Sequence, residues 1–451
     1  MFELMVWATL AYLVRAMGVT LARTRDALHP LMILGPLLIY AYCVRTLLMF
    51  YAGALDQLFR PDQLEFAQIV HSLGLGAFVV GIMKERLPRG TEDRVLPLPE
   101  AERRALESLA YLLGIVAVVA YAFMVASLGG FVAVYSQVKA RVGASSGYIA
   151  DLPLLAYASV LTFCYAWRAR PWTFANLALL LAFVSPNLIH GTLGSRRGPL
   201  FISLAVILFG YLANRRQRPT FTQVSAVVGL AGAAVLFVWA FRTQLYLGSE
   251  FELSDERYAE VLTADDVVYD DPFVSSAGLI NVADASGTVN WGMRYLVVTV
   301  IRPIPRQLWP TKYKDLGVFQ RDRRGEEASR SDIPEHQWIE TLGWVPNEGY
   351  SVGMVGDLFL EFSYLGWIGC FLIGRAYSVL WRRARTQKGV WVVIYLYALG
   401  LSVYVPTQGV ASAWFFRLAF ASIPTYYLWR RFTRTLPIRT VARSLSEAPR
   451  A

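Results

Sequence analysis

Long apolar stretches alternate with short polar connections along most of the chain. A helix needs about 20 apolar residues to cross the ~30 Å hydrocarbon core of a bilayer, and about eleven stretches approach that length. Hydropathy predicts spans at 2–22, 28–52, 64–83, 106–128, 151–168, 172–192, 199–213, 220–242, 352–380, 390–408 and 412–430. The sequence therefore predicts an all-α polytopic membrane protein with about 11 transmembrane helices.

One long polar segment interrupts this pattern. Within it, Trp291–Ile301 is apolar but too short to span, which is typical of an amphipathic helix lying on the outer membrane face. Pro303 and Pro305 follow, and we expect them to end that helix. The predicted organisation is transmembrane helices 1–8 in 1–242, an outer-face insert of short helices in 243–350, transmembrane helices 9–11 in 351–430, and a basic cytoplasmic tail in 431–451.

Composition and charge agree with a membrane protein. Hydrophobic residues make up 55% of the chain and the mean hydropathy is +0.41, values that exclude a soluble globular protein. The net charge of +10 does not indicate nucleic-acid binding, because the Lys and Arg residues lie mainly in short loops at alternate span ends. By the positive-inside rule the N-terminus and the insert face outward, and the C-terminus is cytoplasmic.

The sequence offers little for a metal or a disulfide. Cys43, Cys164 and Cys370 all fall in apolar stretches, so we interpret them as buried small hydrophobic residues. The acidic run Asp265–Asp271 lacks the spacing and the glycine of a calcium loop, so we favour a solvated acidic loop over a cation site. We therefore expect neither a metal nor a cofactor.

Several basic residues are predicted to lie at the outer membrane boundary. A charged side chain inside a membrane costs several kcal/mol unless it is paired or hydrated. A guanidinium group binds two phosphate oxygens through two parallel hydrogen bonds, so such a cluster suits a lipid diphosphate. Snorkelling or pairing with carboxylates of the insert is the alternative for each, and it is the preferred interpretation for Arg45. The candidates for diphosphate or glycan binding are Arg196, Arg197, Arg302, Arg306 and Arg417.

Three residues are candidates for acid–base chemistry. Asp357 and Glu361 are four residues apart, so they share one helix face at the start of the ninth span. His336 is the insert's only histidine. We prefer Asp357 to His336 as a base, because Asp357 lies where the chain re-enters the membrane. A capping or pairing role for Asp357, and a solvated loop position for His336, are the competing interpretations.

Three passages resemble bacterial oligosaccharide repeat-unit polymerases of the O-antigen polymerase (Wzy) type. They are Gly194–Leu200, the stretch from Trp291 to Lys312 with its Pro-Arg and Trp-Pro pairs, and Gly349–Gly366. The sequence departs from the family's usual pattern, which has Glu at Asp357, Asn near Glu361 and Gly at Ser363.

The resemblance implies a glycosyltransferase of the C-type membrane fold in the bacterial inner membrane, active on the periplasmic side. Its substrates would be undecaprenyl-diphosphate-linked oligosaccharides, which it would polymerise into O-antigen, capsule or exopolysaccharide. Lys312 would join the arginines in binding, and no nucleotide or metal would be required. Membrane lipids, a chain-length regulator and a flippase of the same pathway are the partners it implies.

Other functions stay open. An O-antigen-ligase-like enzyme would pass the glycan to a lipid A core, and only the identity of the acceptor separates it from a polymerase. A transporter or lipid flippase is less compatible with an odd number of spans and no detectable internal repeat. A scaffold protein for envelope assembly is the fourth alternative.

Overall fold

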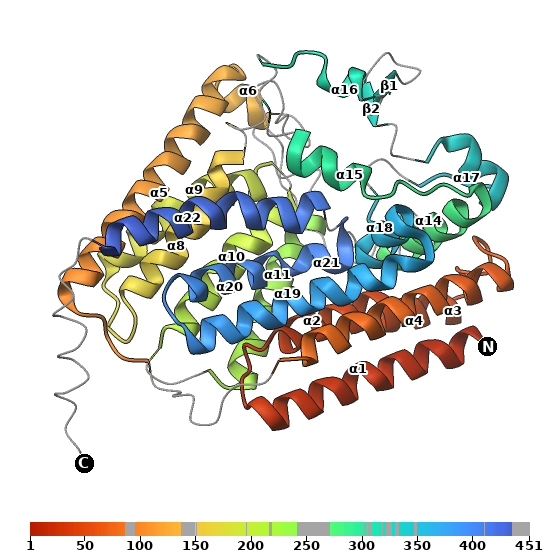
Figure 1. Cartoon of the computed structure of the whole chain (residues 1–451), viewed down its shortest axis with the longest axis horizontal. Helices are drawn as coiled ribbons and strands as arrows, with labels where there is room; N and C mark the ends of the chain where they lie inside the picture. Colours follow the sequence, from red (N-terminus) through yellow and green to blue (C-terminus); the bar gives the residue numbers. More distant parts are fainter. Residues whose placement is uncertain are drawn as a thin grey trace. The chain divides into compact units, whose positions relative to one another are not determined.

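The computed structural model of the chain is predominantly helical (Figure 1). It describes every residue except 86–94, 137–148, 150, 195, 216–218, 241–270, 302–303, 305–307, 317–318, 322–326, 330–332, 347–349, 410 and 435–451.

Seven helices of the described residues are long and apolar enough to cross a membrane: Phe2–Thr24, Pro30–Tyr51, Pro61–Met83, Glu100–Ser127, Phe174–Thr192, Gly353–Thr386 and Val390–Thr407. All seven coincide with predicted spans. Two further predicted spans correspond to the shorter apolar helices Leu152–Ala166 and Gly198–Ala213. The predicted helical membrane class is therefore confirmed, while the count of eleven stays a prediction.

The chain packs as two compact units. The first comprises Met1–Leu87, Glu252–Arg382 and Leu401–Arg417. The second comprises Pro88–Phe251, Arg383–Gly400 and Leu418–Ala451. This division follows packing, whereas the predicted division at 242 and 350 follows membrane topology and stays a prediction.

The first unit contains most of the elements that concern function. They are α1 (Phe2–Thr24), α2 (Pro30–Ile39), the π-helix η1 (Tyr40–Val44), α3 (Arg45–Tyr51), α4 (Pro61–Met83), α14 (Pro272–Ser286), α15 (Met293–Leu296), the π-helix η3 (Val297–Ile301), α16 (Lys312–Asp315), α17 (Glu335–Leu342), α18 (Gly353–Phe362), η4 (Ser363–Leu365), most of α19 (Gly366–Thr386), η5 (Leu401–Val403), α21 (Tyr404–Thr407) and the π-helix η6 (Ala411–Phe416). Strands β1 (Phe319–Arg321) and β2 (Glu327–Ser329) pair antiparallel.

Three basic segments of this unit meet at one end of its helix bundle. Trp381, near the end of α19, donates its indole N–H to Asp26 of the α1–α2 loop at 3.0 Å. Glu85, after α4, pairs with Arg382 at 3.1 Å and also with Arg375. Loops that the positive-inside rule assigned to one side of the membrane therefore lie together in the structure.

A buried helix lies inside the segment that hydropathy predicted to be a polar outer insert. In α14 every residue from Phe273 to Ala283 is buried, and the helix packs against α4, α17 and α18 (Figure 1). Its small side chains permit close approach: a Cβ on Gly356 of α18 would lie 2.6 Å from the hydroxyl oxygen of Ser276. The chain between 273 and 283 is thus part of the core of the unit.

The predicted surface helix at Trp291–Ile301 is present as α15 and η3. It ends at Ile301, directly before the Pro303 region, as expected. Trp291 is 70% exposed, so this face of the segment is apolar and open. An orientation on the membrane surface stays a prediction.

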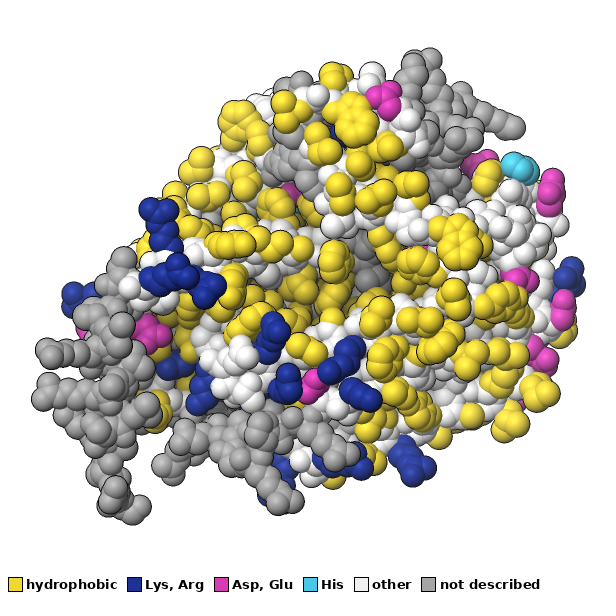
Figure 2. Space-filling model, viewed as in Figure 1, with side chains coloured by type: hydrophobic (Ala, Val, Ile, Leu, Met, Phe, Trp, Pro, Cys, Tyr) yellow, Lys and Arg dark blue, Asp and Glu magenta, His cyan; other side chains and the backbone are white. Residues whose placement is uncertain are grey.

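The second unit is built from α5 (Glu100–Ser127), α6 (Phe131–Tyr135), η2 (Leu152–Leu154), α8 (Leu155–Ala166), α9 (Phe174–Thr192), α10 (Arg197–Ala213), α11 (Phe221–Ala240), α20 (Val390–Gly400) and α22 (Arg417–Arg434), whose first residue belongs to the first unit. Its most extensive helix–helix packing is between α5 and α8. The predicted burial of the cysteines is confirmed, since all three are free and buried. Apolar side chains cover much of the visible face of the molecule (Figure 2).

The break between α18 and α19 depends on an unusual backbone conformation. Ser363 ends α18 with φ 51° and ψ −133°, the first central conformation of a type II′ turn, which glycine adopts most readily. A side chain in such a region costs of the order of 1–3 kcal/mol. Position 363 is also where the resembled family has glycine.

We expect Ser363→Gly to raise the free energy of unfolding by about 1 kcal/mol, because relief of strain outweighs the entropy cost of glycine. Thermal or SDS-induced unfolding in lipid–detergent micelles measures this. Ser185→Gly is the control, since Ser185 lies inside α9 and glycine there should cost about 1 kcal/mol. Equal destabilisation by both changes would contradict the assignment of strain to Ser363.

Candidate functional site

The candidate site is built on α18, where the chain re-enters the helix bundle. Gly353 begins this helix with φ 58°, and a Cβ there would lie 1.8 Å from the Tyr42 hydroxyl oxygen. That hydroxyl donates to the carbonyl of Pro406 at 2.9 Å. The glycine therefore lets α18 start in close contact with η1 and α21, and all residues from Gly353 to Glu361 are buried.

Asp357 and Glu361 share one guanidinium group. Nη2 of Arg294, on α15, lies 3.0 Å from Oδ1 of Asp357, and Nε lies 3.4 Å from Oε1 of Glu361. The Arg294 side chain is 22% exposed, whereas the two carboxylate side chains are 1% and 0% exposed. Burying a carboxylate costs several kcal/mol unless it is paired, so Arg294 is what makes the burial of this pair tolerable.

A tyrosine adds a second contact to Asp357. The Tyr295 hydroxyl donates to Oδ2 of Asp357 at 2.7 Å. Burial, and then the nearby Asp357 carboxylate, raise the pKa of Tyr295 well above its usual value, so the hydroxyl keeps its proton and donates. Asp357 is thus contacted from two sides, by Arg294 and by Tyr295, while Glu361 has the longer contact with Arg294.

Backbone contacts hold α15 in register with α18. The N–H groups of Asn290 and Trp291 donate to the carbonyls of Leu360 and Glu361 at 3.1 and 2.8 Å. Trp291 and Gly292 both have positive φ, 51° and 80°, which turns the chain so that α15 begins beside the end of α18. Arg294 follows within this first turn and reaches both carboxylates.

A glycine lies against Asp357, and π-helical segments lie beside α15. A Cβ on Gly409 would lie 2.7 Å from Oδ1 of Asp357, so only glycine fits at that position without moving the carboxylate. The π-helices η3 and η6 contact each other, and η6 also contacts α15. π-Helical turns often occur at functional sites, where they reorient side chains.

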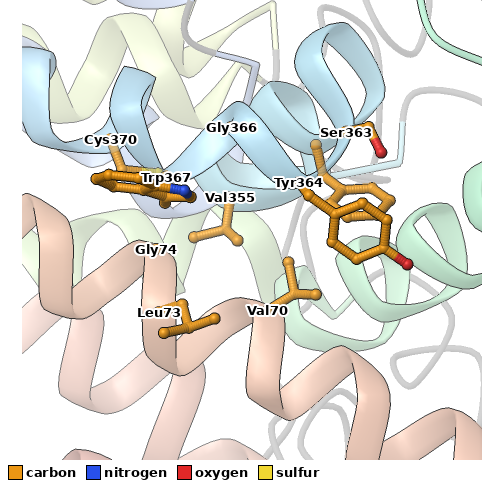
Figure 3. Close-up of a pocket in the computed structure, with 10 residues that line it drawn as sticks. Val70, Leu73, Gly74, Val355, Ser363, Tyr364, Gly366, Trp367 and Cys370 are labelled. Carbon is orange, nitrogen blue, oxygen red and sulfur yellow. The ribbon is translucent and has the colours of Figure 1, made fainter.

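An apolar pocket lies on the other side of α18. Val355 and Phe359 precede Asp357 and Glu361 by two positions, which puts them on the nearly opposite helix face. Figure 3 shows Tyr364 and Trp367 above Val70 and Leu73 of α4. Leu73 and Trp367 are 61% and 50% exposed, so the pocket opens on an apolar surface. It is therefore separate from the charged site.

Arg45 pairs with the insert, as preferred from the sequence. Its Nε lies 3.1 Å from Oδ2 of Asp271, which also caps α14 by accepting from the N–H groups of Phe273 and Val274. Burial raises the pKa of Asp271, and Arg45 opposes that rise. Asp271, the last residue of the acidic run, is therefore an ion-paired helix cap, and the rest of that run lies outside the described residues.

The predicted diphosphate ligands that the structure describes are divided between the two units. Lys312 is buried, and its ammonium group donates to the carbonyls of Ile301, at 2.9 Å, and Ile304. Arg417 lies 4.6 Å from the ring centre of Tyr404. Arg196 and Arg197 belong to the second unit, where Arg196 is exposed at the start of α10. Arg302 and Arg306 lie outside the described residues, so binding by these residues stays a prediction.

His336 and His190 both lie outside the group formed by Arg294, Asp357 and Glu361. His336 is exposed in the first turn of α17, a helix held to the unit through buried Trp338. His190, near the end of α9, is partly exposed, and its Nδ1 makes no hydrogen bond within the described residues. Among the described residues no three His, Cys, Asp or Glu side chains gather in a way that could hold a metal ion.

Sequence reasoning missed Arg294, Tyr295 and Gly409. Arg294 and Tyr295 lie within the passage that resembles the polymerases, but no periodicity links them to residues about sixty positions later. The available signal was the carboxylate pair itself, which needs a cation once it is buried. Gly409 gave no signal, because its role depends on a close approach between distant segments.

No protein-family model, curated protein or solved structure matches this chain. The resemblance to the polymerases therefore stays a prediction.

We expect Arg45→Ala to lower the free energy of unfolding by about 3–5 kcal/mol at neutral pH, because it leaves the buried Asp271 carboxylate unpaired. The folded state then favours protonated Asp271 more than the unfolded state does, so stability recovers as pH falls. Adding Asp271→Asn should restore much of the loss, since asparagine also caps helices. SDS unfolding of each variant tests this, with exposed Arg15→Ala as control. A loss no larger than that of Arg15→Ala would contradict the pairing.

Proposed function

We propose that the chain polymerises undecaprenyl-diphosphate-linked oligosaccharide repeat units on the periplasmic face of the bacterial inner membrane. The observation that supports this most directly is the group of Arg294, Asp357 and Glu361 at the start of an apolar helix. It combines a partly exposed cation with two buried carboxylates. Transfer of a glycan from a lipid diphosphate needs both a group to bind the anion and a group to accept a proton.

In the proposed reaction a hydroxyl oxygen of the acceptor's terminal sugar forms a bond to the anomeric carbon of the donor. The bond between that carbon and the diphosphate breaks, and undecaprenyl diphosphate leaves with the bonding electrons. The hydroxyl proton passes to a carboxylate. The leaving group is already a good one, so stabilising its negative charge and orienting the hydroxyl supply most of the rate enhancement.

The contacts favour a division of roles between the two carboxylates. Asp357 accepts the Tyr295 hydrogen bond and lies close to Arg294, and both contacts stabilise its ionised form. Glu361 is fully buried and its contact with Arg294 is longer, so it is the better proton acceptor. We therefore assign proton acceptance to Glu361 instead of Asp357, the residue preferred from the sequence, and the positioning of Arg294 to Asp357.

Membrane helices support the substrate class. The site belongs to a segment, Gly353–Thr386, that is long and apolar enough to span a membrane. A lipid-linked substrate reaches such a site by moving within the bilayer, so no nucleotide-sugar channel is required. Arg302, Arg306, Arg417 and the Arg196–Arg197 pair remain proposed ligands for the diphosphate or glycan.

Deletion of the gene in its host tests the function. We expect surface glycan of single repeat units, because polymerisation stops while transfer to the acceptor lipid continues. Full-length glycan stranded on undecaprenyl diphosphate would instead indicate a ligase. Repeat units trapped on the cytoplasmic face would indicate a flippase. An unchanged glycan would contradict all three.

Complementation of that strain tests the residues. Glu361→Gln keeps the shape and removes the base, so we expect a loss of about 10²–10⁴ in polymerisation rate and almost no polymer. His336→Ala should restore full polymer length. Exposed Glu340→Gln on α17 is the matched control for removing a carboxylate, with membrane-inserted protein quantified in each strain. Polymer surviving Glu361→Gln and vanishing with His336→Ala would transfer the role to His336.

A further inference from the structure

Arg294 lies between the buried carboxylates and the outside of the unit. Its side chain is 22% exposed, while those of Asp357 and Glu361 are 1% and 0% exposed. Nη1 of the guanidinium is itself buried, so an anion that approaches from outside reaches the exposed part of the Arg294 side chain before it reaches either carboxylate. The same guanidinium is already engaged, through Nη2 with Asp357 and through Nε with Glu361.

A diphosphate competes with the carboxylates for this guanidinium. It has more charge and more acceptor oxygens than a carboxylate, and guanidinium binds phosphate through two parallel hydrogen bonds. Turning toward the diphosphate lengthens the contacts to Asp357 and Glu361. Two carboxylates one helical turn apart then lose the cation that they share, in a site that excludes water. Like charges in such a site favour binding of a proton by one of them.

The surroundings determine which carboxylate takes the proton. Asp357 keeps the Tyr295 hydrogen bond, which stabilises its anion, so the proton goes to Glu361. The other ionisable groups on the elements packed against α18 are engaged elsewhere. They are Asp271 with Arg45, Asp284 with Tyr364, Asp62 with Arg60, Glu65 with the N-terminal amine, His71 with Ala67 and Ser276, Tyr42 with Pro406, and Tyr404 beneath Arg417, while Cys370 is buried.

We propose that diphosphate binding at Arg294 activates Glu361 as a base, so that anion binding is coupled to uptake of one proton. The inference rests on the proposed function for the identity of the anion. In the reaction the acceptor is already bound when the diphosphate engages Arg294, so the proton comes from the acceptor's hydroxyl, whose oxygen bonds to the anomeric carbon as the diphosphate leaves. In the absence of an acceptor the proton comes from solvent, and Glu361 is then no longer able to act as the base. Departure of the lipid diphosphate lets Arg294 return to the carboxylates, and Glu361 releases the proton.

This coupling gives an order to the reaction. Without a donor, Glu361 is paired with Arg294, which weakens it as a base. The donor's own diphosphate removes that restraint, so the acceptor is deprotonated only when there is an anomeric carbon to attack. Arg294 acts twice, first as the counter-ion of the resting site and then as the ligand of the leaving group.

Calorimetric titration of the full-length protein in nanodiscs with inorganic diphosphate tests the proposal. Titration at one pH in two buffers of different ionisation enthalpy gives the number of protons taken up per anion bound. The probe's own protonation is the same for every variant, so variants are compared by difference. We expect wild type to take up about one proton more than Glu361→Gln, and affinity to fall as pH rises. Exposed Glu340→Gln should match wild type.

Three results would overturn the proposal. Equal proton uptake by wild type and Glu361→Gln would remove the coupling. Unchanged affinity in Arg294→Ala would place the diphosphate elsewhere, and so would the absence of binding to wild type. These results are separate from the gene deletion. If the deletion strain loses its polymer but the protein shows no coupling, the proposed function stands and the coupling is refuted. If the deletion strain keeps its polymer but the protein shows coupling, the coupling stands and the proposed function is refuted.

Discussion

The contact on which the candidate site depends is the sharing of one arginine by two buried carboxylates. Asp357 and Glu361 lie on one face of α18, and Arg294 reaches both from α15. Without a cation, burying the two carboxylates would cost several kcal/mol of folding free energy for each of them. The positive-φ turn at Trp291 and Gly292, the backbone bonds to α18 and the close approach of Gly409 all serve to keep these three side chains together.

Buried polar side chains are also paired with partners in and around α14, elsewhere in the first unit. This helix carries serines and an asparagine, yet it is buried, and its polar side chains make defined contacts. Asn281 donates to the carbonyls of Gln63 and Ala277, and Ser276 meets His71. Arg45 neutralises Asp271 at its N-terminus. Asp271, Ser276 and Asn281 are therefore each matched by a partner from a distant part of the chain.

The sequence predicted the membrane helices better than the site, for a physical reason. A span such as Pro61–Met83 can be predicted from its length and apolar composition, which are local properties of the sequence. The placement of Asp357 and Glu361 on one face also follows from helical spacing alone. Burial of α14 could not be predicted, because its residues are too few and too polar for a span. The pairing of Arg294 with Asp357 joins segments 63 positions apart in the chain, and only folding reveals it.

The most direct test of this account is a double-mutant cycle on Arg294→Gln and Glu361→Gln. The free energy of unfolding of wild type, both single variants and the double variant would be measured at neutral pH in lipid–detergent micelles. If the two side chains share a buried ion pair, the double variant loses less than the sum of the single losses, with a coupling energy of about 1–3 kcal/mol. Losses that add to within about 0.5 kcal/mol would contradict it.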